Sequence, residues 1–333
     1  MEWIHDLVLR DDTPETWTRR REQMKARIAS ILGPFPEQTV PLATEVIEEQ
    51  RCEGYTQRKI EFSTEAWDRA RAYLLIPDAG ARPLPAVLCF HGTTGAGKSL
   101  VMGMTDRANR AYAPELAREG YVTLAPDDIG MGEHLLPGAG QKDTRPFYER
   151  FPDRTIEGKR LWDHMRALDL LSGLPEVDAG RIGAFGHSMG GRSTHYLAAF
   201  DERVACAVIS CGLTPFTGNF RLFRTHPAHD PLPTVRQYIL EHGRLPFEKH
   251  ELTGLIAPRP LMLVSPANDG PNPRTDLVSV MAHRVFEVYR LLGKDRNFAR
   301  LVHGDGHDTT PYVRRIIYGW FDLHLKDQPG PDQ

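Results

Sequence analysis

A serine placed between glycines is the residue of this chain with the clearest capacity for chemistry. Ser188 lies in GHSMG, residues 186–190, which is a G-x-S-x-G pattern. An apolar run at 181–186 leads into the pattern, and an amphipathic helical segment at 189–201 leads out of it. This context predicts a tight strand-to-helix turn that exposes the serine hydroxyl as a nucleophile. A Cβ atom at either flanking glycine would collide with neighbouring backbone there.

A serine nucleophile needs a base, and the base needs an acid that orients it. We expect His307 to be the base, because it lies in a loop just ahead of the last helical segment, whereas His303 is still on the preceding strand. We expect Asp269 to be the acid, since it follows the apolar strand 261–265 by four residues. Asp276 is the alternative acid and lies in or near the next helix. The chain order serine, aspartate, histidine fits a strand–turn–helix nucleophile.

The negative oxygen that forms during attack needs two positioned N–H donors. The residue after the nucleophile, Met189, supplies the first donor. The second is expected from the loop HGTTG after the apolar run 86–90, with Thr93 preferred over Thr94. The side chains expected to contact the substrate are Thr94, His187, Phe216 and Phe220.

Short apolar runs alternate with helical segments from residue 85 onward, which predicts an α/β fold with a mostly parallel sheet covered on both faces. The expected strands are 86–90, 121–126, 181–186, 204–210, 261–265 and 298–303, preceded by two strands within 58–77. The expected helices are 106–119, 157–174, 189–201, 275–293 and 309–326. We divide the chain into a helical N-terminal extension (1–55), a catalytic domain (56–327) and a disordered tail (328–333). The irregular stretches 131–154 and 212–253 are expected to act as lids.

Composition excludes several classes of partner. The 333 residues carry 41 Lys and Arg against 44 Asp and Glu, a net charge of -3, so no nucleic-acid partner is expected. No secretory signal and no apolar run long enough to span a membrane is evident, which predicts a cytoplasmic protein. The four cysteines lack C-x-x-C spacing. His303 and His307 lie in a glycine-containing loop without an evident third ligand, so neither a metal nor a cofactor is expected. Homo-oligomer formation stays open.

The motifs HGTTG, APDDIGMGE, GAFGHSMGG, APRPLMLVSPANDG and HGDGH occur in one order, and together they resemble the α/β-hydrolase superfamily. Within it, the chain is similar to the dienelactone-hydrolase-like and acetyl-xylan-esterase-like group. The resemblance implies a triad of Ser188, His307 and Asp269 that cleaves a small-molecule ester through an acyl-enzyme. A prolyl-oligopeptidase-like peptidase is the alternative, but the 55 N-terminal residues are too few for the propeller of those enzymes.

One further pattern points to a different function. Residues 92–99, GTTGAGKS, match the Walker A pattern of nucleotide-binding loops. In such a loop the helix begins at the lysine and serine, so that its N–H groups close over the phosphates. Here the apolar periodicity places the helix start at Thr105 or Asp106. We therefore keep nucleotide binding as a remote alternative and expect Lys98 to be a solvated cation at the cleft rim.

Overall fold

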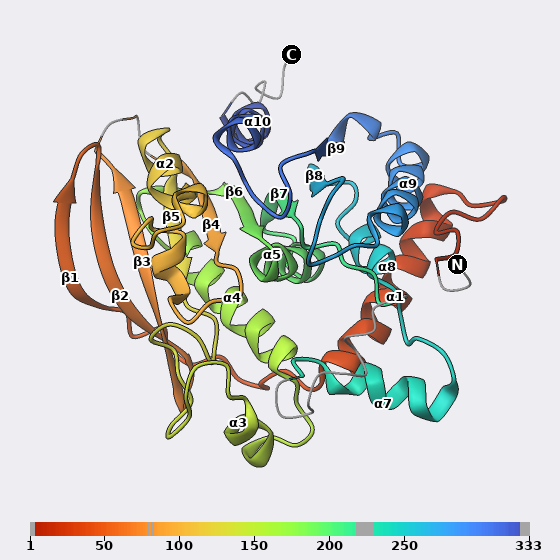
Figure 1. Cartoon of the computed structure of the whole chain (residues 1–333), viewed down its shortest axis with the longest axis horizontal. Coiled ribbons are helices and arrows are strands. Elements are labelled where there is room, and N and C mark those ends of the chain that lie inside the picture. The colour runs from red at the N-terminus through yellow and green to blue at the C-terminus, as the bar shows by residue number, and fades with distance from the viewer. Residues whose placement is uncertain (1–3, 79, 81–82, 218–229, 327–333) are drawn as a thin grey trace.

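The computed structural model describes residues 4–78, 80, 83–217 and 230–326. Its nine strands form a single sheet in the order β1-β2-β3-β5-β4-β6-β7-β8-β9 (Figure 1). β1, β2 and β3 pair antiparallel, β3 also pairs antiparallel with β5, and every later pair is parallel. The strands are β1 (Glu45–Cys52), β2 (Tyr55–Glu65), β3 (Asp68–Pro77), β4 (Leu84–Phe90), β5 (Val122–Pro126), β6 (Val177–His187), β7 (Val204–Ser210), β8 (Leu261–Pro266) and β9 (Phe298–His303).

Helices cover both faces of this sheet. The α-helices are α1 (Pro14–Leu32), α2 (Tyr112–Arg118), α3 (Arg145–Arg150), α4 (Ile156–Ser172), α5 (Met189–Phe200), α7 (Pro233–His242), α8 (Lys249–Gly254), α9 (Thr275–Leu291) and α10 (Pro311–Phe321). α2 and α10 pack on one face with Val87 and Phe185, while α1, α4, α5, α8 and α9 share the core of the other face with Leu88 and Ala184. Alternate residues of the central strands therefore feed two separate cores, as a sheet buried on both sides requires.

The architecture confirms the predicted fold class, a mostly parallel sheet with helices on both faces and an N-terminal helix. Strand β1 was not predicted, because its sequence EVIEEQRC is almost fully exposed and lacks the alternation of a half-buried strand. It lies inside the segment that we treated as a helical extension and pairs along β2 at the edge of the sheet. No helix among the described residues is long and apolar enough to cross a membrane.

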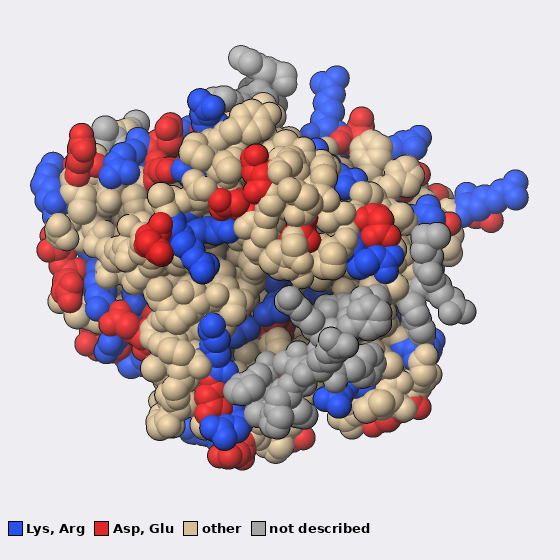
Figure 2. All heavy atoms as spheres, viewed as in Figure 1, with Lys and Arg blue, Asp and Glu red and all other residues tan. Residues whose placement is uncertain are grey.

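The two irregular stretches behave differently. The first, 131–154, contains α3, and its Leu136 and Phe147 form a small apolar cluster with the flanking Ile129 and Ile156. The second, 212–253, contains α7 and most of α8, and part of it lies outside the described residues. Figure 2 shows acidic and basic side chains interspersed over one face of the molecule, without a single-sign patch on that face.

The loop 92–99 departs from a nucleotide-binding loop. Only a short 3-10 turn (Gly97–Leu100) follows its glycines, and α2 begins as late as Tyr112, so a start at Thr105 or Asp106 was wrong. The prediction that Lys98 is solvated was also wrong, since the residue is 1% exposed. Its ammonium donates to Asp127 Oδ2 at 2.6 Å, and its backbone N–H donates to Asp127 Oδ1 at 2.6 Å. The lysine that would hold a phosphate is thus bound to a carboxylate of the protein itself.

Candidate active site

Ser188 occupies the single-residue junction between β6 and α5. Its backbone angles are φ 60° and ψ -117°, a conformation that is strained for a residue with a Cβ atom. Its N–H donates to Ser210 O at the end of β7, 2.8 Å away, which ties the turn to the neighbouring strand. A strained, hydrogen-bonded turn at the carboxyl end of a central strand is the geometry predicted for a nucleophilic serine.

The glycines beside Ser188 are required by close backbone contacts. A Cβ atom on Gly186 would lie 2.2 Å from Gly190 O, and one on Gly190 would lie 2.1 Å from Phe90 O. Both distances are too short for a carbon atom, so the predicted collisions are confirmed. Because of these contacts, the start of α5 packs directly against the end of β4. The loop 92–99, which follows β4, therefore begins close to Ser188.

His307 and Asp269 come together across two loops. His307 Nδ1 lies 2.9 Å from Asp269 Oδ1. Asp269 is buried and also accepts the backbone N–H of Asn272 at 3.1 Å. Burial alone would raise the pKa of Asp269, but the hydrogen bond and charge of His307, together with Asn272, lower it below its ordinary value. Asp276, the alternative acid, instead pairs with Arg274 at 2.7 Å at the exposed start of α9.

The loop that carries His307 is fixed by a cation that the sequence did not reveal. Arg110 donates from Nη2 to His307 O at 2.7 Å and from Nη1 to Thr309 Oγ1 at 2.9 Å, and it pairs with Asp308 at 2.6 Å. Arg110 and His307 are 197 positions apart, and no local pattern connects them. Arg110 therefore acts on the position of the histidine through the histidine's own backbone.

His187 was expected to contact the substrate, but in the structure it is buried against the ring of His307. The two rings lie 4.6 Å apart in a T-shaped contact, and His187 Nδ1 lies 2.9 Å from Ser210 Oγ. Burial, with the nearby cation Arg110, lowers the pKa of His187 well below its usual value, so its imidazole stays neutral. His187 is absent from the cavity wall described below, because its ring is 2% exposed and packs inward.

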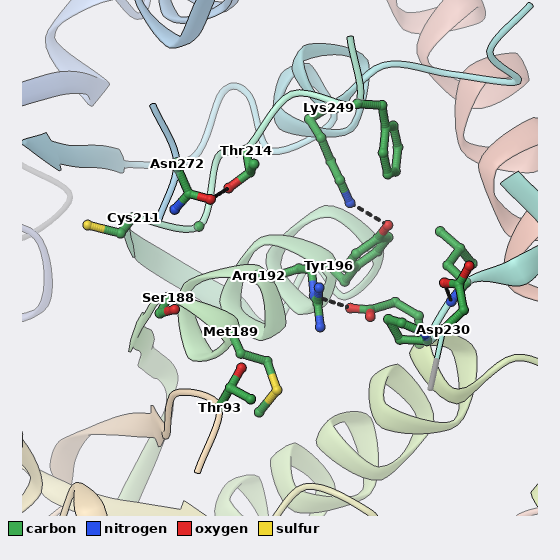
Figure 3. Close-up of a pocket in the computed structure, with 15 residues that line it drawn as sticks. Thr93, Ser188, Met189, Arg192, Tyr196, Cys211, Thr214, Asp230, Lys249 and Asn272 are labelled. Carbon is green, nitrogen blue, oxygen red and sulfur yellow. Dashed lines mark hydrogen bonds and ion pairs between the residues drawn. The ribbon is translucent and has the colours of Figure 1, made fainter. Parts of the chain in front are cut away.

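The loop after β4 lies beside the nucleophile. A Cβ atom on Gly92 would lie 3.7 Å from Ser188 Cβ, and Thr93 lines the same cavity as Ser188 and Met189 (Figure 3). Thr94 does not line that cavity; its hydroxyl accepts the N–H of Ala96 at 3.1 Å, within the loop. The structure thus brings Thr93, and not Thr94, to the side of Ser188.

A cavity of about 260 Å³ opens next to Ser188. Phe216 lines it as expected, whereas Phe220 lies outside the described residues. The cavity wall contains more polar residues than apolar ones, and both basic and acidic side chains are among them. The lining residues are Thr93, Glu157, Ser188, Met189, Arg192, Tyr196, Cys211, Gly212, Thr214, Phe216, Asp230, Pro231, Leu232, Lys249 and Asn272.

Helix α5 forms one wall of this cavity along its length. Ser188, Arg192 and Tyr196 are spaced four residues apart, so they lie one above the other on a single helix face (Figure 3). Arg192 pairs through Nε with the buried Glu157 of α4 at 3.2 Å. Neither residue was predicted, although the spacing of Arg192 from the nucleophile was a usable signal once the helix had been recognised.

Two groups of side chains in the described residues have the donor types of a metal site. The first, His187, Cys211 and His307, adjoins Ser188, but burial raises the pKa of the Cys211 thiol and disfavours the thiolate that a metal would bind. In the second, Asp68, His134 and Asp163, both carboxylates already pair with the ammonium of Lys159.

Comparison with known proteins places the chain among ester hydrolases. A family model described as "Glucuronyl esterase, fungi" matches residues 121–293, more than half of the chain. A model described as "Abhydrolase family" matches residues 5–143. The two matches together run from the N-terminal helix through the nucleophile and the acid to α9.

Full-length relatives agree with these matches. YtaP of Bacillus subtilis (strain 168), named as a hydrolase, is 25% identical over 314 residues, covering 90% of this chain and 99% of that protein. Carbohydrate esterase MZ0003, from an unknown prokaryotic organism, is 26% identical over 342 residues, covering 86% of this chain and 78% of that protein. A glucuronoyl esterase from Solibacter usitatus has a similar fold, with a TM-score of 0.75, 19% identity and 97% of each chain covered.

Proposed function

Because the chain belongs to the glucuronyl esterase family, we propose that its substrate is an ester in which a sugar acid provides the acyl group. The chain is a carboxylic ester hydrolase with an α/β-hydrolase fold. The observation that carries the finer proposal is the arrangement around the cavity. A serine on a strained turn lines a polar cavity that contains an arginine–glutamate pair, and Cys211 and Asn272 of the cavity wall lie next to a histidine–aspartate pair.

In the proposed mechanism, Ser188 Oγ attacks the ester carbonyl while His307 accepts the hydroxyl proton. Asp269 accepts the Nδ1–H of His307, which leaves Nε2 as the proton-accepting nitrogen and stabilises the imidazolium that forms. His307 then returns the proton to the leaving alcohol. Water, deprotonated by the same nitrogen, then attacks the acyl-enzyme; His307 passes this proton to Ser188 Oγ as the acid leaves, which restores the free serine. No hydrogen bond joins Ser188 to His307 within the described residues, and such contacts often tighten only with substrate bound.

The backbone N–H groups of Met189 and Thr93 are the proposed donors to the oxyanion. Met189 is the first residue of α5, where helix N–H groups lack intrahelical partners and the helix dipole favours negative charge. Thr93 belongs to the loop that packs against Ser188. A donor of this kind contributes roughly 3–4 kcal/mol to stabilisation of the transition state.

Arg192 and Glu157 are the proposed contacts to the sugar. Arg192 lies about one helical turn, about 6 Å, beyond Ser188 along α5, which is close to the width of a pyranose ring, and Glu157 of α4 pairs with it there. A guanidinium group donates and a carboxylate accepts, so the pair can hold two neighbouring hydroxyl groups. A simple acetyl group has no hydroxyl group to offer to either side chain. This supports a sugar-acid acyl group over an acetyl group.

A fluorophosphonate probe tests the nucleophile. The probe should add its mass to the peptide that contains Ser188, and Ser188→Ala should abolish both labelling and ester hydrolysis, with a loss of at least about 10³-fold. The acid is tested by a matched pair. Asp269→Asn should lower kcat by about 10⁴-fold, because the histidine loses its orienting acceptor, whereas Asp276→Asn should change it less than about two-fold. Labelling at another residue, or equal effects of the two aspartate variants, would contradict the mechanism.

A substrate panel tests the acyl group. We expect methyl and benzyl esters of glucuronic acid to be hydrolysed with a kcat/KM at least ten-fold above that of acetylated xylose. Arg192→Met should reduce this preference, while Arg274→Met, on the exposed start of α9, serves as the control.

A peptide anilide is included because the same triad can cleave amides. Preferred cleavage of the anilide would support the peptidase alternative.

A further inference from the structure

The structure buries three lysines among its described residues, and two of them are neutralised by carboxylates. Lys98 pairs with Asp127 at 2.6 Å, and Lys159 pairs with Asp68 at 2.6 Å. The third, Lys249, has no ion pair with any carboxylate in the described part of the chain. Burial of an unpaired ammonium is costly, so Lys249 calls for a specific explanation.

Lys249 is the first residue of α8, is 4% exposed and lines the cavity beside Ser188. Its ammonium donates one hydrogen bond, to Tyr196 Oη at 2.7 Å, and Figure 3 shows the two groups meeting. The ring centres of Tyr196 and Phe216 lie 4.3 and 4.5 Å from the nitrogen. Aromatic faces replace part of the lost hydration. Two of the three ammonium protons, and the Tyr196 hydroxyl proton, have no acceptor among the described residues.

Lys249 changes between its charged and its neutral form near neutral pH. Burial lowers the pKa of Lys249 to about 7, with Glu157 of α4 and Glu248 ahead of α8 opposing this shift and Arg192 of α5 reinforcing it. His195, also on α5, is neutral, because burial, together with the Lys249 charge, lowers its pKa well below the usual value. A bound anion would therefore meet a group able to take the positive charge.

The position of this pair relative to the nucleophile follows from helix geometry. Tyr196 lies eight residues after Ser188 on the same face of α5, which is about 12 Å along the helix axis. Arg192 lies halfway between them. A substrate that places its ester carbonyl at Ser188 and extends along α5 would bring a group two helical turns away to Lys249 and Tyr196.

We infer that the end of the cavity formed by Lys249 and Tyr196 binds a carboxylate of the substrate, so that the enzyme prefers esters that carry a second acidic group about 12 Å from the ester carbonyl. The inference rests on the proposed function for the position of the carbonyl. A carboxylate offers acceptors to the ammonium and to the tyrosine hydroxyl, and it supplies the missing counter-charge.

The test compares charged and uncharged esters of matched length. Monomethyl esters of straight-chain diacids of six to twelve carbons are compared with methyl esters of the corresponding ω-hydroxy acids. A second arm places the charge on the alcohol, using acetyl esters of ω-hydroxy acids against monoacetates of diols. We expect the effect in one of the two arms, according to whether the acyl group or the alcohol extends toward Lys249. In that arm, the longer charged esters should show a kcat/KM roughly ten-fold or more above that of their neutral partners, the gain expected from one or two charge-assisted hydrogen bonds.

This preference should depend on Lys249 and on pH. Lys249→Met should bring the ratio close to one, and Arg274→Met should leave it as in the wild type. For the wild type the ratio should fall between pH 6 and pH 8.5, because Lys249 loses its proton through about pH 7 while the substrate carboxylate stays charged. The pH series needs no variant, so it stands even when Lys249→Met fails to fold. No charge preference in either arm, or a preference unaffected by both Lys249→Met and pH, would overturn the inference.

Failure of the proposed function is recognised separately, as absent labelling of Ser188 and no hydrolysis of the neutral esters by the wild type. In that event, calorimetric binding of suberate to the wild type and to Lys249→Met decides the inference. Binding that is lost in the variant, and whose enthalpy depends on the buffer because a proton is taken up, supports it. Absent or variant-independent binding rejects it.

Discussion

Lys98 and Lys249 are both buried, yet their surroundings are opposite. Lys98 belongs to the loop 92–99, where Asp127 and Glu133 accept from its ammonium and Gly97 leaves room for the Asp127 carboxylate. Lys249 lies at the cavity wall with a tyrosine hydroxyl and aromatic rings around it. At Lys98, carboxylates of the protein itself neutralise the ammonium and hold the loop in place. At Lys249, no carboxylate of the described residues pairs with the ammonium, so an anionic ligand can do so, as in a binding site.

Backbone groups as well as charges surround the Asp127 carboxylate that binds Lys98. A Cβ atom on Gly97 would lie 2.0 Å from Asp127 Oδ1, and one on Gly132 would lie 2.1 Å from the same atom. The Asp127 carboxylate accepts the N–H groups of Lys98 at 2.6 Å and of Glu133 at 2.9 Å. Gly97, the last glycine of the Walker pattern, thus makes room for an internal carboxylate, whereas Gly92, the first, lies beside Ser188.

Removal of Lys98 is expected to have the largest effect on stability. Lys98→Met leaves the buried Asp127 carboxylate without its cation, and such a change typically costs about 3–5 kcal/mol of unfolding free energy. Lys59→Met is the matched control, since Lys59 contacts the same Glu133 at 2.9 Å but in a more exposed position, and a loss below about 1 kcal/mol is expected. Urea unfolding of both variants measures the difference. Equal losses would show that Asp127 does not depend on Lys98.

Removal of Lys249 is expected to change stability in the opposite direction. Lys249→Met replaces an unpaired buried ammonium with an apolar chain of similar length, for which a gain of roughly 1–4 kcal/mol is reasonable. The folded-state pKa of Lys249, about 7, lies below its unfolded value. The unfolded chain therefore binds the extra proton above pH 7, and the wild type recovers stability as pH rises. The gain from the variant should be larger at pH 6 than at pH 8.5 in urea unfolding.

A loss of stability in Lys249→Met at pH 6 would contradict this account. It would mean that the tyrosine hydroxyl and the aromatic rings already compensate the charge fully. Lys249 would then stabilise the fold, as Lys98 does, and the presence of a lysine in the cavity wall would no longer indicate a binding site.

The contrast also explains how far the sequence could lead. The strands from β2 onward, the helices between them and the serine turn were largely predictable, because apolar periodicity and glycine placement are local signals, whereas β1, α3, α7 and α8 were not predicted. His307 and Asp269 followed from chain order and from their position after strands. Arg110, Glu157 and Lys249 could not be found in this way, since their roles arise from contacts between distant segments. Lys98 was misread for the same reason: its partner Asp127 lies 29 positions away, directly after β5.

The smallest expected effect concerns nucleotides. Magnesium ATP should raise the melting temperature of the wild type no more than sulfate of equal ionic strength does, because the ammonium of Lys98 and the N–H groups beside it are already bound to Asp127. A ligand at 100 times its Kd would add about 2.7 kcal/mol, which a thermal scan detects readily. Any weak anion effect should disappear in Lys249→Met and persist in Lys98→Met, since the ammonium of Lys98 is bound to two carboxylates and that of Lys249 pairs with none in the described residues. A magnesium-dependent shift with the reverse dependence on the two lysines would identify the loop 92–99 as a phosphate site after all, and would make Lys98 the ligand-binding lysine of the pair.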